Sequence, residues 1–194
     1  MPRALIFSDI HNDSKALEKL MDIEADYYFA AGDLVNWARG LDKMGEIMKP
    51  RAERVYVLPG NHETEADIAA FCSRYGFVNF HGGLIEIEGT QVGGLGYSGP
   101  TPFDTPGEYS EQELRDRLAK FSGLDPLVLI CHTPPRNTAL DRAGEGLHFG
   151  SEAIGEFIQR EQPRYFYCGH IHEAAGQHIT LGRTQAWNVG KRGQ

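Results

Sequence analysis

The sequence has few cysteines, and their placement excludes several cysteine-based architectures. It contains only Cys72, Cys131 and Cys168, an odd number with no CxxC pair. This count and spacing argue against a disulfide framework and against a zinc knuckle. Cys131 and Cys168 lie near candidate ligand histidines, but both fall in apolar, strand-like runs, where a free cysteine behaves as a small buried hydrophobe. We therefore interpret these two as core residues rather than thiolate ligands.

Long apolar runs and an excess of basic residues are also missing. No apolar stretch reaches the roughly 18 residues that a membrane span requires, and the apolar run near the N-terminus is too short for a signal peptide. These absences predict a cytoplasmic protein without a membrane anchor. The formal net charge is −8, which disfavours a strong nucleic-acid surface. An acidic protein that acts on an anionic substrate needs a local positive charge, and bound metal can supply it.

The order of apolar runs and amphipathic stretches predicts an α/β fold. Short apolar runs predict strands at Ala4–Phe7, Tyr27–Ala30, Val55–Leu58, Leu127–Ile130 and Tyr165–Tyr167. Amphipathic stretches predict helices at Ser14–Ile23, Glu65–Tyr75, Ser110–Phe121 and Ser151–Arg160. Strands that alternate with helices are typical of βαβ units and a largely parallel sheet.

Three segments depart from this alternation. Leu84–Leu95 is typical of a hairpin that turns at Gly89–Thr90, and Gln177–Leu181 with Thr184–Val189 is typical of a second one. The Gly- and Pro-rich stretch Gly96–Gly107 predicts an irregular surface loop. Antiparallel ribbons therefore join the parallel units, and we expect them to contribute to a second sheet.

The length of the chain suits one domain. A chain of 194 residues can bury a sizeable core. Its apolar fraction of 41% and charged fraction of 24% are ordinary for a globular protein. No internal repeat, low-complexity segment or interdomain linker interrupts it, so we expect a single domain over residues 1–194.

Residues that bind metal or exchange protons follow each of the five main strand-like runs. The blocks after these runs are Asp9-Ile10-His11, Gly32-Asp33, Gly60-Asn61-His62-Glu63, His132 and Gly169-His170-Ile171-His172. Ligands of open α/β sheets bind at the carboxyl ends of the strands, so strand geometry should bring these blocks to one edge. Any single block occurs often by chance, whereas five at equivalent places are a strong signal for a catalytic or metal centre.

This series of blocks resembles the calcineurin-like metallophosphoesterase family. All five blocks are present in order, and the resemblance extends from residue 9 to at least residue 172. The third block is GNHE where many members have GNHD, which leaves the role of Glu63 open. The resemblance implies an α/β (α+β) fold, a β-sandwich of two mixed sheets flanked by α-helices, with a dinuclear metal centre at the strand ends. The chain has no room for a cap domain.

Carried over residue by residue, the resemblance implies seven metal ligands and one proton donor. The implied ligands of one metal are Asp9, His11 and His172, those of the other are Asn61, His132 and His170, and Asp33 bridges the two. His62 binds neither metal and faces the leaving group. The implied reaction is in-line attack on phosphorus by a hydroxide that bridges the metals, with His62 as general acid.

The donor types make chemical sense independently of the resemblance. Nitrogen and hard oxygen ligands suit Mn²⁺, Fe or Zn²⁺ rather than copper(I), which prefers sulfur. Only the two aspartates among the seven implied ligands are anionic, so two divalent ions leave a site charge of about +2 before hydroxide binds. That charge would attract a phosphate ester and stabilise its transition state.

The segments CHTPP, HFGSEAI and CGHIHE resemble a branch of the family that includes small phosphodiesterases such as the class III cyclic-nucleotide enzymes. We therefore predict hydrolysis of small phosphodiesters, with phosphomonoester hydrolysis as the alternative. A non-catalytic binding module, like the retromer scaffold subunit of the same fold, is a second alternative, although every ligand position here holds a competent residue. The physiological substrate, the native metal and the oligomeric state, a homo-oligomer included, stay open.

Several residues outside the five blocks have more than one interpretation. His148 precedes a predicted helix and either touches substrate or is structural. Packing is the favoured role of Trp37 and Tyr97, with a substrate wall as the alternative. Arg136 either binds phosphate or faces solvent. Asn12–Ser14 is interpreted as a helix cap rather than a substrate contact.

Overall fold

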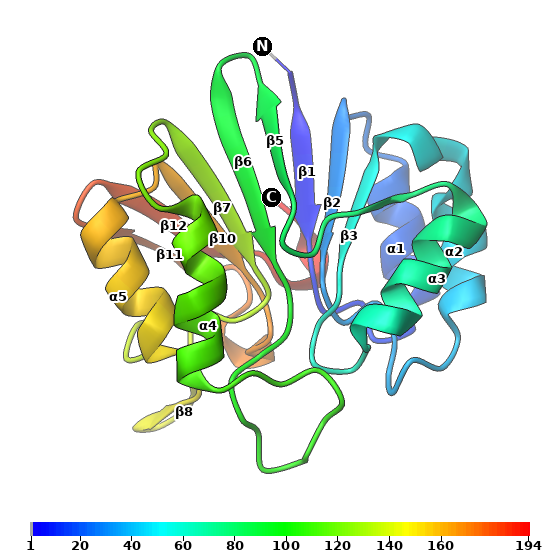
Figure 1. Cartoon of the computed structure of the whole chain (residues 1–194). Coiled ribbons are helices and arrows are strands. Elements are labelled where there is room, and N and C mark those ends of the chain that lie inside the picture. Colours follow the sequence, from blue (N-terminus) through cyan, green and yellow to red (C-terminus); the bar gives the residue numbers. More distant parts are fainter. Residues whose placement is uncertain (1) are drawn as a thin grey trace.

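The computed structural model describes residues 2–194, and two β-sheets pack face to face between two layers of helices (Figure 1). Within these residues the first sheet has four strands in the order β1-β2-β3-β4, and all of them pair in parallel. Its strands are β1 (Ala4–Phe7), β2 (Tyr27–Ala31), β3 (Val55–Leu58) and β4 (Val78–Asn79). The second, mixed sheet has six strands in the order β11-β12-β10-β7-β6-β5. Its strands are β5 (Leu84–Ile87), β6 (Thr90–Leu95), β7 (Leu127–Cys131), β10 (Tyr165–Cys168), β11 (His178–Leu181) and β12 (Thr184–Asn188).

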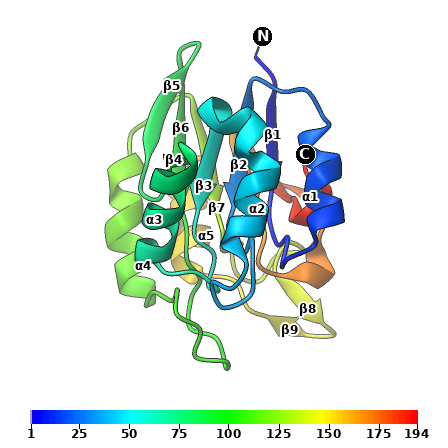
Figure 2. The same cartoon turned by 90° about the vertical axis from the view of Figure 1, so that its right-hand side faces the viewer.

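Helices cover the outer face of each sheet. The first sheet is covered by α1 (Ser14–Met21), α2 (Leu41–Met48) and α3 (Glu65–Tyr75), and the second by α4 (Glu111–Leu118) and α5 (Glu152–Glu161). A small hairpin of β8 (Arg142–Gly144) and β9 (Leu147–His148) lies apart from both sheets at the lower edge of the molecule in Figure 2. None of the helices in the described part of the chain combines the length and apolar character that a membrane crossing needs.

The expected fold class is confirmed, and most expected elements lie where the sequence predicts them. The five main strands agree with their predicted ranges to within one residue, and both predicted hairpins form. The first hairpin turns through Glu88 and Gly89, whose φ angles of 46° and 76° match a tight two-residue turn. Helix α2, strand β4 and the β8–β9 hairpin are additions that the sequence patterns did not predict.

Three hydrophobic layers hold the sandwich together. Alternation along β1 sends Ile6 into the layer between the sheets and Phe7 into the layer under α1–α3. Phe29 from the first sheet and Ile130 from the second meet in the middle layer, and Phe157 of α5 packs in the third layer beneath the second sheet. Because both faces of the central strands are buried, these strands are almost continuously apolar.

The direction of the strands determines where the polar blocks lie. Strands β1, β2 and β3 run parallel to one another, and so do β6, β7, β10 and β12. The carboxyl ends of both sets lie at the lower edge of Figure 1, where the loop after β6 and the β8–β9 hairpin also lie. The five blocks therefore meet at one end of the sandwich, as expected for an open α/β sheet.

A half-buried histidine, His81, fastens the long loop that leaves β6 toward this edge. The backbone N–H of Gly96 donates to Nδ1 of His81 over 3.1 Å, and His81 Nε2 lies 2.9 Å from the hydroxyl of Tyr109. The first contact requires a neutral ring with its proton on Nε2. Burial accordingly lowers the pKa of His81 to about 4.

Replacing His81 with Asn should reduce the acid sensitivity of the fold. The unfolded chain binds a proton at His81 near pH 6.5, whereas the folded chain does so only near pH 4, so folding stability falls as the pH drops through this window, by about 1–3 kcal/mol. Asn retains an acceptor and does not titrate. Urea unfolding at pH 7 and pH 4.5 should show a smaller loss for His81→Asn than for the wild type. His178→Asn, at an exposed histidine of β11, should behave like the wild type, and an undiminished loss in His81→Asn would contradict the assignment.

Candidate metal centre

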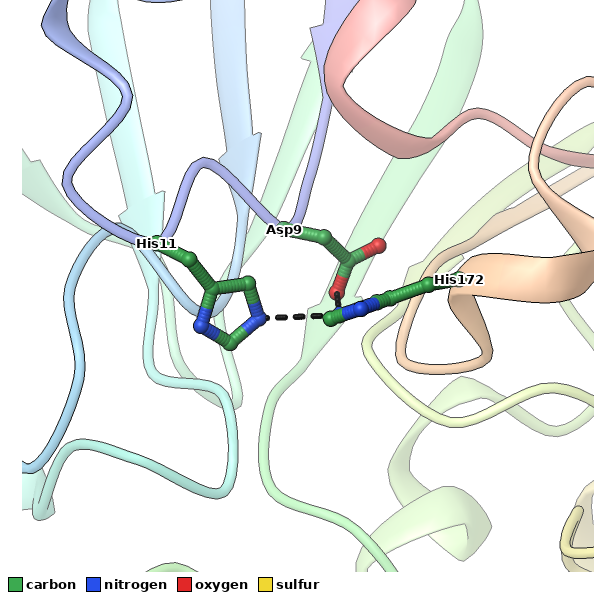
Figure 3. A group of neighbouring side chains, drawn as sticks. All are labelled: Asp9, His11 and His172. Carbon is green, nitrogen blue, oxygen red and sulfur yellow. Dashed lines mark hydrogen bonds and ion pairs between the residues drawn. The ribbon is translucent and has the colours of Figure 1, made fainter.

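All eight site residues predicted from the sequence meet at the shared strand edge, and the first group comes from the loops after β1 and β10. Asp9, His11 and His172 bring one potential ligand atom each to within 4.8 Å of one another. Nε2 of His172 lies 2.9 Å from Nε2 of His11 and 3.8 Å from Oδ1 of Asp9 (Figure 3). Segments 161 residues apart in the chain thus supply one three-ligand cluster.

A second group lies beside the first. Asp33, His132 and His170 also bring ligand atoms to within 4.8 Å of one another. Oδ1 of Asn61 joins them, 2.9 Å from Nδ1 of His170 and 3.2 Å from Nε2 of His132. Asn61, at 4% exposed, and His132 are buried, whereas His170 is half-buried.

Asp33 lies between the two groups. Its Oδ2 atom is 3.5 Å from Nε2 of His11 and 3.3 Å from Nε2 of His132. Its other oxygen accepts a hydrogen bond from the backbone N–H of His62 at 3.0 Å, which fixes the carboxylate in this orientation. A single carboxylate with histidines of both groups at this distance is positioned as a bridging ligand requires.

Hydrogen bonds on the far side of two histidines aim their lone pairs at the centre. Nδ1–H of His132 donates to the carbonyl of Ala31 at 2.9 Å, and Nδ1–H of His11 donates to Oδ1 of Asn36 at 2.6 Å. In both rings Nε2 is then the free acceptor, which is the tautomer that a metal ligand needs. Asn36 was not predicted from the sequence, although it follows Asp33 by only three residues on the same strand-end loop.

The backbone around the centre is strained. The φ angles of Asp9, His11, Asp33 and His170 are 58°, 46°, 54° and 68°, in the left-handed region that residues with a Cβ rarely adopt. Such residues cluster at functional sites, where the surrounding structure holds them in place. Here Asp9 accepts the backbone N–H of His170 with both carboxylate oxygens, at 3.0 and 3.1 Å.

Two glycines permit the close approach of these loops. A Cβ at Gly60 would collide with the backbone and carboxylate of Asp33, and a Cβ at Gly169 would collide with Ser8 and the carboxylate of Asp9. The glycines of the third and fifth blocks are therefore required by packing against the two aspartates, in addition to allowing tight turns.

The charges at the centre are strongly coupled. Burial opposes ionisation of Asp33, but His132 holds the pKa of Asp33 well below its usual range. Burial disfavours a charged His132, yet the carboxylates of Asp33 and Asp9 raise the pKa of His132 to about 9. Burial and the neighbouring His132 lower the pKa of His170 to about 3, and burial raises the pKa of Asp9. A cation at this position is thus electrostatically favoured, and divalent ions fit the nitrogen and oxygen donors that surround it.

Glu63, whose role the sequence left open, ties the loop after β3 to the loop after β2. It is fully buried, and its carboxylate accepts N–H groups from Asp33 at 3.1 Å, Val35 at 3.0 Å and Gly60 at 2.8 Å. Burial and the adjacent carboxylate of Asp33 raise the pKa of Glu63 to about 8, against the lowering effect of these N–H groups. Glu63 acts on the centre by holding the backbone of Asp33 rather than as a ligand.

His62 lies at the edge of the two groups and lines a cavity of about 370 Å³ together with His11, Asp33, Asn61 and His172. The backbone N–H of Trp37 approaches Nδ1 of His62 at 3.4 Å, which leaves the ring proton on Nε2. Burial lowers the pKa of His62, while the nearby carboxylate of Asp33 raises it. Its ring stands nearly perpendicular to that of His11, at 5.1 Å between centroids.

The residues outside the five blocks differ in their burial and in whether they line the cavity. Trp37 is 49% exposed beside His62, so the packing role favoured for it is wrong, whereas Tyr97 is buried, as expected. His148 is held by the buried carboxylate of Asp141, with its Nδ1 2.7 Å from Oδ1, and does not line the cavity. Arg136 lies 3.8 Å from Glu152 and also lies outside the cavity.

Two further interpretations are confirmed. Cys131 and Cys168 are buried free thiols whose pKa values burial raises far above the usual range, so they belong to the core. Asp13 caps α1 by accepting the backbone N–H of Ala16 at 3.0 Å.

Comparisons with known proteins identify the family and the fold. The model of the calcineurin-like phosphoesterase family matches residues 2–174. An uncharacterised protein of Methanocaldococcus jannaschii is 32% identical over 178 residues, which cover 86% of this chain and 78% of that protein. The structure of the Thermus thermophilus protein TT1561 superposes with a TM-score of 0.72 at 20% identity, covering 98% of this chain and 90% of the other. The phosphopantetheinyl hydrolase of Mycobacterium tuberculosis superposes with a TM-score of 0.66 at 16% identity, covering 97% and 89%.

Glu63→Gln should loosen the strand-end loops. The amide nitrogen would face at least one of the three N–H groups that Glu63 accepts, and a buried donor without a partner costs about 1–3 kcal/mol. We expect a loss of about 2 kcal/mol in the free energy of unfolding, measured by urea denaturation at a pH above the raised pKa of Glu63, which is about 8, so that the wild-type side chain is a carboxylate. Glu65→Gln, two residues away and exposed in the first turn of α3, is the matched control and should change stability little. Equal stability of the two variants would show that the three N–H groups do not depend on the carboxylate.

Proposed function

The chain belongs to the calcineurin-like phosphoesterase family, and from this premise we propose that it hydrolyses small phosphodiesters at a centre of two divalent metal ions. The observation that carries the proposal is that the cluster of Asp9, His11 and His172 adjoins the cluster of Asp33, His132 and His170, with Oδ2 of Asp33 3.5 Å from His11 and 3.3 Å from His132. One ion would be held by Asp9, His11 and His172, the other by Asn61, His132 and His170, with Asp33 shared between them. These nitrogen and oxygen donors suit Mn²⁺, Fe or Zn²⁺.

When bound, the two ions lower the pKa of a water molecule and stabilise the negative charge that develops on the phosphoryl group. The protein's own part is to keep the ligand atoms in place. Asn36 and the carbonyl of Ala31 orient His11 and His132, and the backbone N–H of His62 orients Asp33. Because these partners are fixed before substrate binds, little reorganisation accompanies the reaction.

His62 is the proposed proton donor to the leaving group. It lies outside the clusters that hold Asp9 and His132, shares a third group of potential ligand atoms with His11 and Asp33, and lines the cavity beside them. As the bond from phosphorus to the leaving oxygen breaks, that oxygen gains negative charge, and a proton from the imidazolium form of His62, which gives up the 3.4 Å contact from Trp37, neutralises it. Burial works against the protonated ring, and the carboxylate of Asp33 favours it.

The charge of the cavity favours a diester over a monoester. Among the described residues that line it there is no lysine or arginine, and Asp33 and Glu173 contribute negative charge. A monoester carries up to two negative charges near neutral pH and usually draws on basic side chains in addition to metal ions. A diester carries a single charge, which the ions alone can balance.

Metal-stripped protein should regain hydrolysis of bis(4-nitrophenyl) phosphate when Mn²⁺ or Zn²⁺ is added. In Asp33→Asn the rate should fall by at least about 100-fold, because loss of a ligand exceeds the 10–100-fold effect of losing a group that only supports one. Asp22→Asn, at an exposed carboxylate beyond α1, is the control and should retain full activity. Faster hydrolysis of 4-nitrophenyl phosphate than of the diester would indicate a monoesterase. Folded protein without turnover under any metal would favour a non-catalytic binding module.

His62→Ala should slow the hydrolysis of esters with poor leaving groups more than that of esters with good ones. A general acid contributes about 100-fold or more when the leaving alkoxide is a strong base, and far less when it is nitrophenolate. We therefore expect kcat/KM to fall about 100-fold for an alkyl diester and less than tenfold for the nitrophenyl diester, at unchanged metal content. His178→Ala, remote on β11, should leave both rates unaltered. Equal slowing of the two esters would show that His62 is not the proton donor to the leaving group.

A further inference from the structure

Exposed aromatic side chains gather at the strand edge that carries the metal centre. Within residues 2–194 the exposed aromatics are Trp37, Phe103 and Phe149, at 49%, 74% and 47%. Trp37 contacts His62 edge-on, at 5.7 Å between ring centroids, and the other two line the cavity that contains the centre. Large apolar side chains left in water at one place typically mark a binding surface.

The cavity therefore has two chemically different walls. One wall carries the polar residues of the centre, and the other is formed by Pro100, Pro102, Phe103, Phe149 and Ile171. The apolar wall draws mainly on two separate loops, the one after β6 and the one that joins β9 to α5. No described lysine or arginine lines either wall, so apart from bound ions nothing here is arranged to recognise a second anionic group.

We propose that the wall formed by Phe103 and Phe149 binds a planar, apolar ester group of the substrate and selects phosphodiesters that carry one. This inference rests on the proposed function, because it assigns the organic part of a substrate whose phosphate lies at the metal centre. A volume of about 370 Å³ accommodates a ring system next to a phosphoryl group. Aromatic rings bind such a group by stacking and by removing its apolar surface from water.

The group bound by this wall is the leaving group. His62 lines the same cavity as Phe103 and Phe149, and the proposed proton transfer from His62 ends on the oxygen of the departing alcohol. We therefore assign to the apolar wall the ester group whose oxygen receives the proton of His62. Hydrolysis adds water across its P–O bond, so the products are the apolar alcohol and a phosphomonoester.

Binding of two phosphonates tests the wall without turnover. Calorimetry on Mn²⁺-loaded protein should give a Kd for phenylphosphonate about tenfold below that for methylphosphonate, from the apolar area that the ring removes from water. In the double variant Phe103→Ser, Phe149→Ser this ratio should approach one, while the Kd of methylphosphonate stays the same. Leu147→Ser is the matched control, because Leu147 is 53% exposed on the neighbouring hairpin and does not line the cavity. A ratio of one in the wild type, or an unchanged ratio in the double variant, overturns the proposal.

Hydrolysis of 4-nitrophenyl methylphosphonate tests whether the apolar wall binds the group that departs or the group that stays on phosphorus. Its only aromatic group is the one that departs, so kcat/KM should fall about tenfold in the double variant, mainly through KM. An unchanged kcat/KM together with weaker phenylphosphonate binding would assign the wall to the retained ester and overturn the leaving-group assignment. The proposed function is tested separately. It fails if Asp33→Asn keeps its metal-dependent turnover, and this outcome does not depend on the ratio of the Kd values of the two phosphonates.

Discussion

Everything at the centre depends on the common direction of the strands in the two sheets. Because β1, β2 and β3 end at the same edge as β7 and β10, five short blocks reach one place although the chain between them is long. Neither sheet alone supplies both clusters. His11 follows a strand of the first sheet and His172 follows one of the second, yet their Nε2 atoms lie 2.9 Å apart. The packing of sheet on sheet is therefore a condition for the site, and the apolar middle layer that holds Phe29 against Ile130 serves the chemistry indirectly.

Convergence of this kind has a cost in conformational strain and in buried charge. Residues such as Asp9 and Asp33 adopt left-handed backbone, and a fully buried glutamate lies next to a second carboxylate. Glu63 compensates for part of this cost, since three backbone N–H groups from three loop positions converge on it. The carboxylate of Glu63 is thus unfavourable as a charge next to Asp33, but it also fixes the loop that carries Asp33. Divalent ions would relieve the remaining repulsion, so folding of the loops and metal binding favour one another.

The sequence predicts the strands well, and it marks eight residues that the structure brings together at one edge, because both rest on local patterns. An apolar run that stops at a polar block marks a buried strand and the residue that follows it. Helices α3, α4 and α5 begin after Thr64, Ser110 and Ser151, whose side chains cap them, and all three were predictable. Helix α2 begins after Gly40 without any side-chain cap and was missed.

Other features depend on contacts that no local pattern encodes. The anchoring role of Glu63 requires knowing that Val35 and Gly60 lie beside it, and Asn36 is identified only by its contact with His11. Trp37 and Tyr97 have similar loop contexts in the sequence, yet Trp37 contacts His62 and stays half exposed, whereas Tyr97 packs against Tyr109 and is buried. Loop conformation decides these cases, and it is set by the tertiary structure.

The charges of the cavity determine how attraction of the phosphate and discrimination between substrates are divided among its residues. The protein is acidic overall, and no described basic side chain faces the cavity, so attraction of a phosphate ester depends on bound ions. Ions held at the five strand ends would provide that attraction equally for any ester, because they would bind the phosphoryl group that all esters share. Discrimination must then come from the loops that carry Phe103 and Phe149. Such loops tolerate substitution without disturbing the core, whereas a change at Gly60 or Asp33 disturbs the centre itself. Selectivity can thus change independently of the metal chemistry.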